Sequence, residues 1–396
     1  MVEKKSCSMV QAIPLRLLML GGCAVAVLHN MMTPSLQGYI RSSLDCPTTA
    51  VSQTADLDHA FSRVAAPFKP YRSAPMEDYI LKHTKQLGYQ ATSLNSSFCC
   101  TIWNDKKAST VYDDLHKYVR ELGHYYERVR NFTSPFTDLR KALVSSVADP
   151  DGTSVCDSLE LHPNGLVGGI FQSQQLSETT RMGFVEPLLP SLRHIGFCSN
   201  KAKFFMNLDY LVHDFAAMCR RMSSTSRTVF VDMGASLDFH GDKASPAMTL
   251  IKLYAQFGMP FDHIYAYEVT PTEPDKVFRL LPDEMQAAYH WINVPVDPDP
   301  DGSRNPLRML LENYGPEDLI VVKLDIDTPS VEMPMVEQLL NNPRLHVLVD
   351  QFYFEHHVHM AEMERSWGKK VNGSVHDSLT LFHALREKGV AAHHWV

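Results

Sequence analysis

The pattern of hydrophobic positions changes near residue 226. From residue 227 onward, short runs rich in Val, Ile and Tyr alternate with segments of helical periodicity. The expected strands are 228–232, 263–268, 289–296, 319–325, 345–354 and 390–395. Runs of this kind with helices between them are typical of a parallel sheet wound by crossover helices. The pattern therefore predicts an α/β fold with a doubly wound, mostly parallel sheet over 227–396.

Residues that start or end helices predict helices between these strands. Ser245 can cap a helix that has Pro246 at its first position, and Gly258 lies just past its end. A second helix is expected near 276–286. A third is expected over 376–388, where a glycine follows the last periodic residue.

The region before residue 227 has a different pattern. Residues 33–75 carry scattered Pro, Ser and Thr, which is typical of a stem or linker. Residues 76–226 are predicted to be mainly helical, because apolar residues recur at three- and four-residue spacing over 109–130 and 205–221. No chemistry can be assigned to this region from its sequence.

The first residues predict a membrane anchor. Lys4, Lys5 and Arg16 precede an apolar run over 17–28. We expect residues 1–32 to form a cytosolic tail and a signal-anchor, with the rest of the chain in the lumen of the endoplasmic reticulum or Golgi. A cleaved signal peptide, which would give a secreted protein, and a buried core helix are the alternatives.

The cysteines and glycosylation sequons bear on that location. Six of the 8 cysteines lie between the apolar run and residue 220: Cys46, Cys99, Cys100, Cys156, Cys198 and Cys219. An even number in a lumenal region fits up to three disulfides, although the sequence does not choose the pairing. Sequons at Asn95, Asn131 and Asn372 agree with a lumenal glycoprotein. Buried thiols in a cytosolic protein are the alternative.

The charge balance argues against one class of partner. The chain has 37 Lys and Arg against 45 Asp and Glu, which gives a net charge of −8. A protein that neutralises many phosphates needs a basic face. Nucleic acid is therefore not an expected partner.

The candidate chemistry lies at the ends of the expected strands, because ligands of a doubly wound sheet bind beyond the carboxyl ends. The first strand ends in Asp232 and is followed by Gly234, which would let the backbone approach a ligand closely. The second strand ends in Glu268, a carboxylate placed to hold ribose hydroxyls. The fourth ends in Lys323 and Asp325.

The ordered series VFVDMGAS, IYAYE, IVVKLDID and a strand running into EHH resembles the FkbM-type methyltransferases, over roughly 227–396. The resemblance implies a Rossmann-like sheet that binds S-adenosylmethionine. It places the methionine part of the cofactor at Asp232, Gly234, Ala235 and Ser236, its ribose at Glu268, and Lys323 and Asp325 beside the transferred methyl. Asp238 stands where the family usually has a second glycine. After Asp325, Asp327 replaces a family glutamate and residues 328–330 lengthen the turn before Glu332.

A hydroxyl acceptor needs a base, and Asp325 and His356 are the candidates. Glu355, His357 and His359 would share one face of an extended segment and could offer metal ligands. We favour a histidine-rich strand end with one functional imidazole and assign no metal. The acidic stretch 297–302 is expected to be a polar turn.

Two other functions stay open. Asp325 and Asp327, two residues apart after a strand, resemble the metal-binding carboxylates of Golgi glycosyltransferases that use nucleotide sugars. A non-catalytic binding protein with a methyltransferase-like fold is the other alternative. The acceptor, whether glycan, lipid or peptide, is not selected by any residue.

Overall fold

The computed structural model describes most of the chain after residue 70: residues 71–91, 100–104, 112–145, 153–161, 183–190, 198, 206–236, 245–368 and 371–396. The expected anchor (1–32) and nearly all of the expected stem (33–75) lie outside these residues. Within the part that is described, no helix has both the length and the apolar character needed to cross a bilayer.

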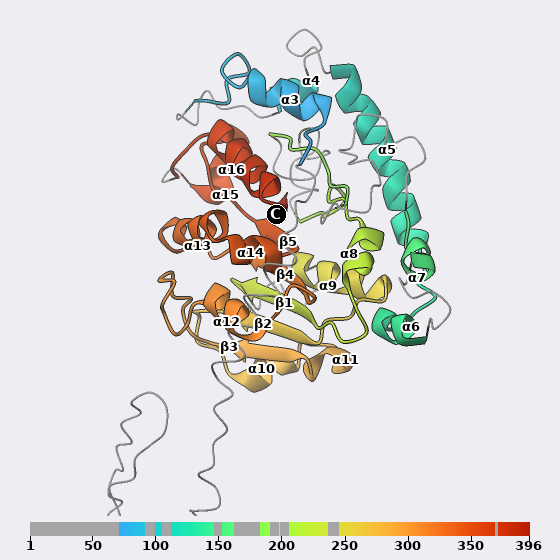
Figure 1. Ribbon diagram of the computed structural model, residues 1–396. Helices are drawn as coiled ribbons and strands as arrows, with labels where there is room; N and C mark the ends of the chain where they lie inside the picture. Colours follow the sequence, from blue (N-terminus) through green and yellow to red (C-terminus); the bar gives the residue numbers. More distant parts are fainter. Residues whose placement is uncertain are drawn as a thin grey trace, which may run out of the picture. The chain divides into compact units, whose positions relative to one another are not determined.

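A six-stranded sheet forms the centre of the structure, and all of its strands are parallel (Figure 1). The strand order is β3-β2-β1-β4-β5-β6. The bounds are β1 Thr228–Met233, β2 His263–Tyr267, β3 Tyr289–Ile292, β4 Leu319–Leu324, β5 Gln351–Phe354 and β6 Ala391–His394. The prediction of a parallel α/β sheet of Rossmann-like type is confirmed.

Helices connect consecutive strands, as parallel pairing requires. They are α9 Pro246–Gln256, α10 Pro274–Phe278, α11 Asp283–Gln286, α12 Pro306–Asn313, α13 Pro329–Asn341, α14 Pro343–Leu348, the 3₁₀ turn η5 Ala361–Met363, α15 Glu364–Trp367 and α16 Val375–Glu387. In Figure 1, α12, α13, α14 and α16 lie on one side of the sheet and α9 on the other.

Three expected elements after residue 270 are wrong in detail, and one of them is the strand expected over 289–296, which ends at Ile292. The single helix near 276–286 is two short helices, because Pro282 interrupts it and stands at the start of α11. The strand expected over 345–354 begins only at Gln351, and its first half belongs to α14. The side chain of Asn342 caps that helix by accepting a hydrogen bond from the Arg344 amide.

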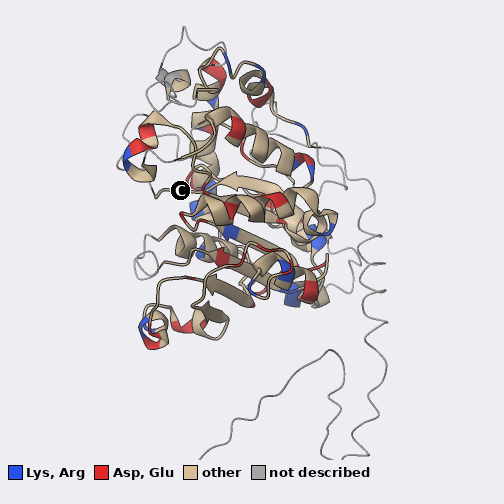
Figure 2. Ribbon diagram, turned by 90° about the vertical axis from the view of Figure 1, so that its left-hand side faces the viewer, with Lys and Arg blue, Asp and Glu red and all other residues tan. Residues whose placement is uncertain are grey.

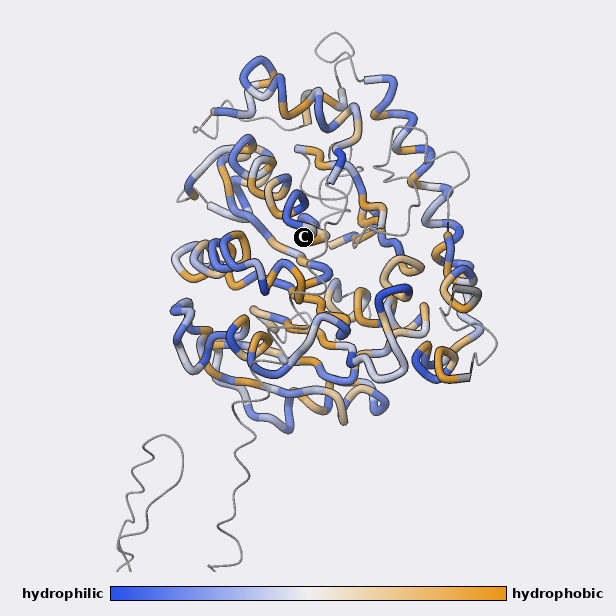
Figure 3. The backbone as a smooth tube through the Cα atoms, viewed as in Figure 1, coloured by the Kyte–Doolittle hydropathy of each residue, from blue (hydrophilic) through white to orange (hydrophobic). Residues whose placement is uncertain are grey.

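The described part of the preceding region is helical, with α3 Pro75–Lys82, α4 Thr101–Asn104, α5 Tyr112–Asn131, α6 Leu139–Ser145, α7 Thr153–Asp157 and α8 Phe215–Arg221. Hydrophobic and hydrophilic residues alternate along α5 (Figure 3), and its buried residues include Leu115, Leu122 and Val129. The helix expected over 205–221 starts only at Phe215. Its start is fixed by Asp214, whose side chain accepts a hydrogen bond from the Ala217 amide.

One hydrophobic core runs through both regions, across the expected boundary near residue 226. Phe257, which ends α9, stacks between Phe132 and Phe215, at ring-centroid distances of 4.2 and 3.8 Å. Aromatic contacts of this kind add to the burial of apolar area. The helical region is thus packed directly against the sheet domain.

Two disulfides tie the helical region together. Cys156 pairs with Cys219 and joins α7 to α8, and Cys100 pairs with Cys198. Cys46 and Cys99 lie outside the described residues. Bridges that close loops of 63 and 98 residues stabilise a fold by about 2–4 kcal/mol each, chiefly by restricting the unfolded chain.

We expect buried imidazoles that are kept neutral, among them those of His213 and His394, to destabilise the fold in mild acid. Burial lowers the pKa of His213 to about 3 and lowers that of His394 far below 6.5. The unfolded chain takes up protons at these positions below about pH 6.5, whereas the folded chain does not. The contribution of these two imidazoles to the free energy of unfolding should therefore fall between about pH 6.5 and 4, by up to about 1.4 kcal/mol per pH unit for each imidazole.

Denaturant unfolding from pH 4.5 to 7.5 measures this slope. His213→Gln can keep a hydrogen bond to the Tyr353 hydroxyl, 2.6 Å from the imidazole, and should reduce the slope by about one proton. His124→Gln, at an exposed position of α5, is the matched control and should leave the slope unchanged. Equal slopes for the wild type and His213→Gln would contradict the prediction.

Candidate ligand site at the carboxyl edge of the sheet

The candidate site lies where the strand order reverses. From β1 the chain winds to β2 and β3, and then it returns to the other side of β1 as β4. In an open α/β sheet, ligands bind beyond the carboxyl ends of the strands at this switch point. The two central strands end there in register, with Asp232 opposite Lys323 and Met233 opposite Leu324.

An ion pair joins these two strands. Among the six described strands, Asp232 and Lys323 are the only Asp, Glu, Lys or Arg residues, whereas charged residues are interspersed over the helices (Figure 2). Lys323 Nζ donates to Asp232 Oδ1 at 2.8 Å and to the Gly234 carbonyl at 3.1 Å. Asp325 Oδ2 lies 3.5 Å from the same ammonium.

The ion pair is almost fully removed from solvent, since 5% of the Lys323 side chain and 3% of the Asp232 side chain are exposed. Burial alone would lower the pKa of Lys323, but the attraction of Asp232 and Asp325 outweighs it and raises that pKa. Lys323 therefore stays charged. A buried ammonium of this kind depends on its carboxylate partners.

Gly234 is required by the approach of the two strand ends. Its φ is +92°, and a Cβ placed there would lie 1.6 Å from the carbonyl oxygen of Asp325. The amide of Asp325 in turn donates to the Met233 carbonyl at 3.0 Å. The glycine therefore serves the contact between β1 and β4, whereas the sequence had suggested only an approach to ligand.

A cavity of about 240 Å³ opens at this edge. Its lining includes five residues that the sequence singles out as site residues: Asp232, Gly234, Ser236, Lys323 and Asp325. The other lining residues are Met206, Pro246, Ala247, Asp327, Glu355, Ser366, Trp395 and Val396. Trp395 was missed, although the rule of examining the residue after each strand would have found it beyond β6.

Three predicted site residues do not line the cavity. Ala235 is buried, and its amide donates to the Tyr267 carbonyl. Glu268 follows β2, and its carboxylate accepts a hydrogen bond from the Thr270 amide at 2.7 Å. His356 stacks on Phe354, and burial lowers the pKa of its imidazole to about 4, so this group is neutral near pH 7.

Asp325 is the expected base that the structure does bring to the cavity. Burial raises its pKa to about 7, Lys323 opposes that rise, and Glu355 and Asp327 add to it. Glu355 follows β5 and was not selected as a catalytic residue from the sequence. Four carboxylates and one ammonium thus line the cavity, and this balance favours cationic groups of a ligand.

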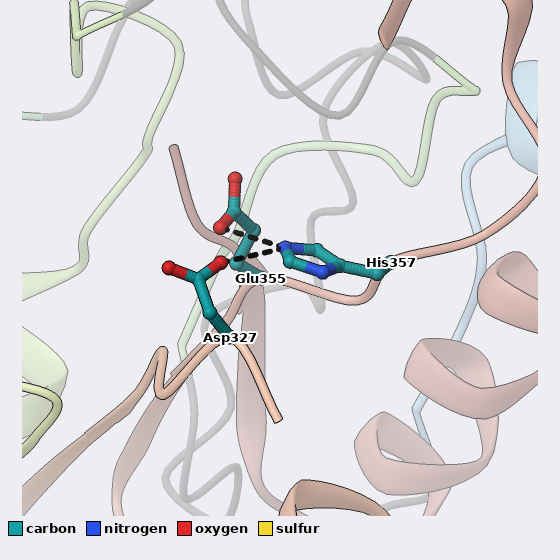
Figure 4. A group of neighbouring side chains, drawn as sticks. All are labelled: Asp327, Glu355 and His357. Atoms are coloured by element: carbon teal, nitrogen blue, oxygen red, sulfur yellow. Dashed lines mark hydrogen bonds and ion pairs between the residues drawn. The ribbon is translucent and has the colours of Figure 1, made fainter. Parts of the chain in front are cut away.

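Beside the cavity, Asp327, Glu355 and His357 converge (Figure 4). His357 Nε2 lies 3.0 Å from Glu355 Oε2 and 3.6 Å from Asp327 Oδ1. Asp327 has a left-handed backbone, with a φ of 57°, and its carboxylate points toward Glu355 and His357 (Figure 4). The face expected for Glu355, His357 and His359 does not form a common group, since the described cluster contains Asp327 instead of His359.

The turn after Asp327 also differs from expectation. Residues 328–330 do not lengthen a loop, because α13 begins at Pro329. Glu332 lies in the first turn of that helix and accepts a hydrogen bond from the Ile326 amide at 2.9 Å. This contact holds the segment between Asp325 and Asp327 in place.

No family model, curated protein or solved structure matches this chain. The class of protein is therefore assigned from the fold and the cavity alone. The chain is an α/β protein with a Rossmann-like parallel sheet and a polar cavity at the carboxyl edge of that sheet.

Replacing Gly234 should destabilise the protein strongly, because alanine would press on the backbone of Asp325. We expect Gly234→Ala to lower the free energy of unfolding by about 4 kcal/mol or more, in the range of the most damaging single substitutions. Gly389→Ala is the matched control, since its φ is +91° and no atom lies within 4 Å of an added Cβ. The control should lose only about 1–2 kcal/mol from its left-handed backbone. Equal losses in denaturant unfolding would show that the strand contact does not constrain this position.

Proposed function

We propose that this chain is a methyltransferase that uses S-adenosylmethionine, resembles the FkbM type and methylates a hydroxyl acceptor. The observation that carries the proposal is the cavity at the β1–β4 switch point, where Asp232, Lys323 and Asp325 meet. This is the position at which an open α/β sheet binds its ligands.

The charges of the cavity fit the methionine end of that cofactor, whose sulfonium and ammonium groups are cationic. Four carboxylates against one lysine leave the lining with an excess of negative charge. The volume of about 240 Å³ is below the roughly 300–1,000 Å³ of a typical small-molecule site. The cavity therefore suits the methionine end, and Glu268 lies outside it as the carboxylate proposed to hold the ribose.

The cofactor, when bound, would supply an activated methyl group. The residues would then align the acceptor and remove its proton. Asp325 is the proposed proton acceptor, because it lines the cavity and only 20% of its side chain is exposed. Lys323 would hold the carboxylates of Asp232 and Asp325 in a fixed relation. His356, the other expected base, has no such position.

The same proposal places the chain in the secretory pathway. Two disulfides favour an oxidising compartment, and Asn131 and Asn372 are exposed at two of the three sequons. A glycan, a lipid or a peptide hydroxyl is the proposed acceptor class. Attachment through an N-terminal signal-anchor remains part of this proposal.

The glycosyltransferase alternative has less support. It needs Asp325 and Asp327 to act on one metal-bound diphosphate. In the structure Asp325 faces Lys323, whereas Asp327 faces His357. A binding protein with the same fold differs from the proposed enzyme only in lacking turnover.

The cofactor proposal predicts a thermal shift. S-adenosylhomocysteine at about 100 times its dissociation constant should stabilise the full chain by about 2.7 kcal/mol and raise its Tm by several degrees. Asp232→Asn should abolish the shift. Ser236→Leu should also abolish it, because leucine adds volume to the cavity lining and leaves the ion pair of Lys323 intact.

Glu284→Gln, at an exposed position of α11, is the matched control and should keep the full shift. Differential scanning fluorimetry makes the comparison. A thermal shift with a nucleotide sugar and Mn²⁺ but none with S-adenosylhomocysteine would overturn the methyltransferase proposal. A thermal shift with S-adenosylhomocysteine but no methyl transfer to any acceptor would favour the alternative of a non-catalytic binding protein.

A further inference from the structure

The cluster beyond β4 and β5 combines three different side chains from two strand ends. Asp327 follows β4, and Glu355 and His357 follow β5. One ligand atom from each lies within 4.8 Å of the others. We infer that these three residues bind one divalent transition-metal cation beside the cavity.

The distances agree with such a cation. Ligand atoms about 2.1 Å from a tetrahedral metal are roughly 3.4 Å apart. In the structure, His357 Nε2 lies 3.0 Å from Glu355 Oε2 and 3.6 Å from Asp327 Oδ1. A cation can therefore take the place of the hydrogen bond between the imidazole and Glu355 with only small movements of these side chains.

The donor set indicates the class of metal. One imidazole nitrogen and two carboxylate oxygens suit Zn²⁺, Mn²⁺, Fe²⁺ or Co²⁺ better than Ca²⁺, which takes six to eight oxygens. Three protein ligands also leave a coordination position open, as in catalytic metal sites. Asp327 and Glu355 both line the cavity, so the open position would face its contents.

A neighbouring tryptophan holds two of the ligands in place. Trp367 Nε1 donates to Glu355 Oε1 at 3.0 Å, which leaves Oε2 toward His357. The ring of Trp367 also stacks on that of His357, with centroids 4.9 Å apart. Supporting contacts of this kind orient metal ligands and raise affinity.

The site does not depend on the proposed methyl transfer. Its ligands differ from the ion pair of Asp232 and Lys323, and metal binding can be measured without any cofactor. Failure of one proposal therefore leaves the other to be tested separately.

The test uses the full chain after treatment with EDTA, titrated with Zn²⁺, Mn²⁺ or Co²⁺ alone in a calorimeter. We expect one equivalent of at least one of these ions to bind, and Co²⁺ to quench part of the tryptophan fluorescence. Asp327→Asn and His357→Ala should each weaken binding by more than about 100-fold, beyond the about 10–100-fold of a supporting residue. Because 81% of the Asp327 side chain is exposed, Asp327→Asn should fold normally.

His359→Ala is the matched control, since it removes a neighbouring imidazole outside the cluster, and it should bind the metal as the wild type does. Trp367→Phe should weaken binding by about 10-fold and remove most of the Co²⁺ quenching. The inference is overturned if the wild type binds none of the three ions at micromolar concentration. It is also overturned if His359→Ala loses the metal while Asp327→Asn retains it.

Discussion

The close approach of the ends of β1 and β4 is the constraint on which the rest of the site depends. Gly234 leaves room for the carbonyl of Asp325, and the Asp325 amide bonds back to Met233. This contact fixes the register that sets Asp232 opposite Lys323. If the strand ends separated, a buried ammonium would lose its partner, at a cost of several kcal/mol. The backbone geometry of the two strand ends therefore determines the electrostatics of the site.

The charged side chains at the end of β4 all line the cavity, but they have two different sets of partners. Lys323 and Asp325 alternate with the buried Leu324, so both reach the cavity. Two residues later the left-handed backbone of Asp327 breaks that alternation and turns its carboxylate toward Glu355. One short segment thus supplies Asp325, the proposed proton acceptor, beside Lys323 and Asp327, the metal-ligand candidate, beside His357. This difference in partners argues against the pair acting as two ligands of a single cation.

The sequence predicts the sheet well because each central strand is a run of β-branched and aromatic residues with turn-forming residues on both sides. The rule of strand ends also finds Asp232, Lys323 and Asp325. It cannot predict that Glu268 bonds to the amide of Thr270, because that choice depends on a local turn. Nor can periodicity select Asp327 over His359 as the neighbour of His357, since a positive φ at an aspartate leaves no periodic signal. The start of β5 only at Gln351 follows from α14, which Asn342 caps and which takes the first residues of the expected strand.

The helical region before the sheet contributes directly to the site, although no chemistry could be read from it. The Tyr210 hydroxyl donates to the carbonyl of His394, and Glu186 holds both Arg386 and His393 in the interior. These contacts fix β6, and Trp395, which follows β6, lines the cavity with its ring 5.9 Å from Lys323 Nζ. Because buried charges such as Glu186 and Arg386 are tolerated only when they are paired, the two regions must fold together. The wall of the cavity at β6 is therefore set in part by Tyr210 and Glu186, which lie 184 and 207 positions before their partners in β6.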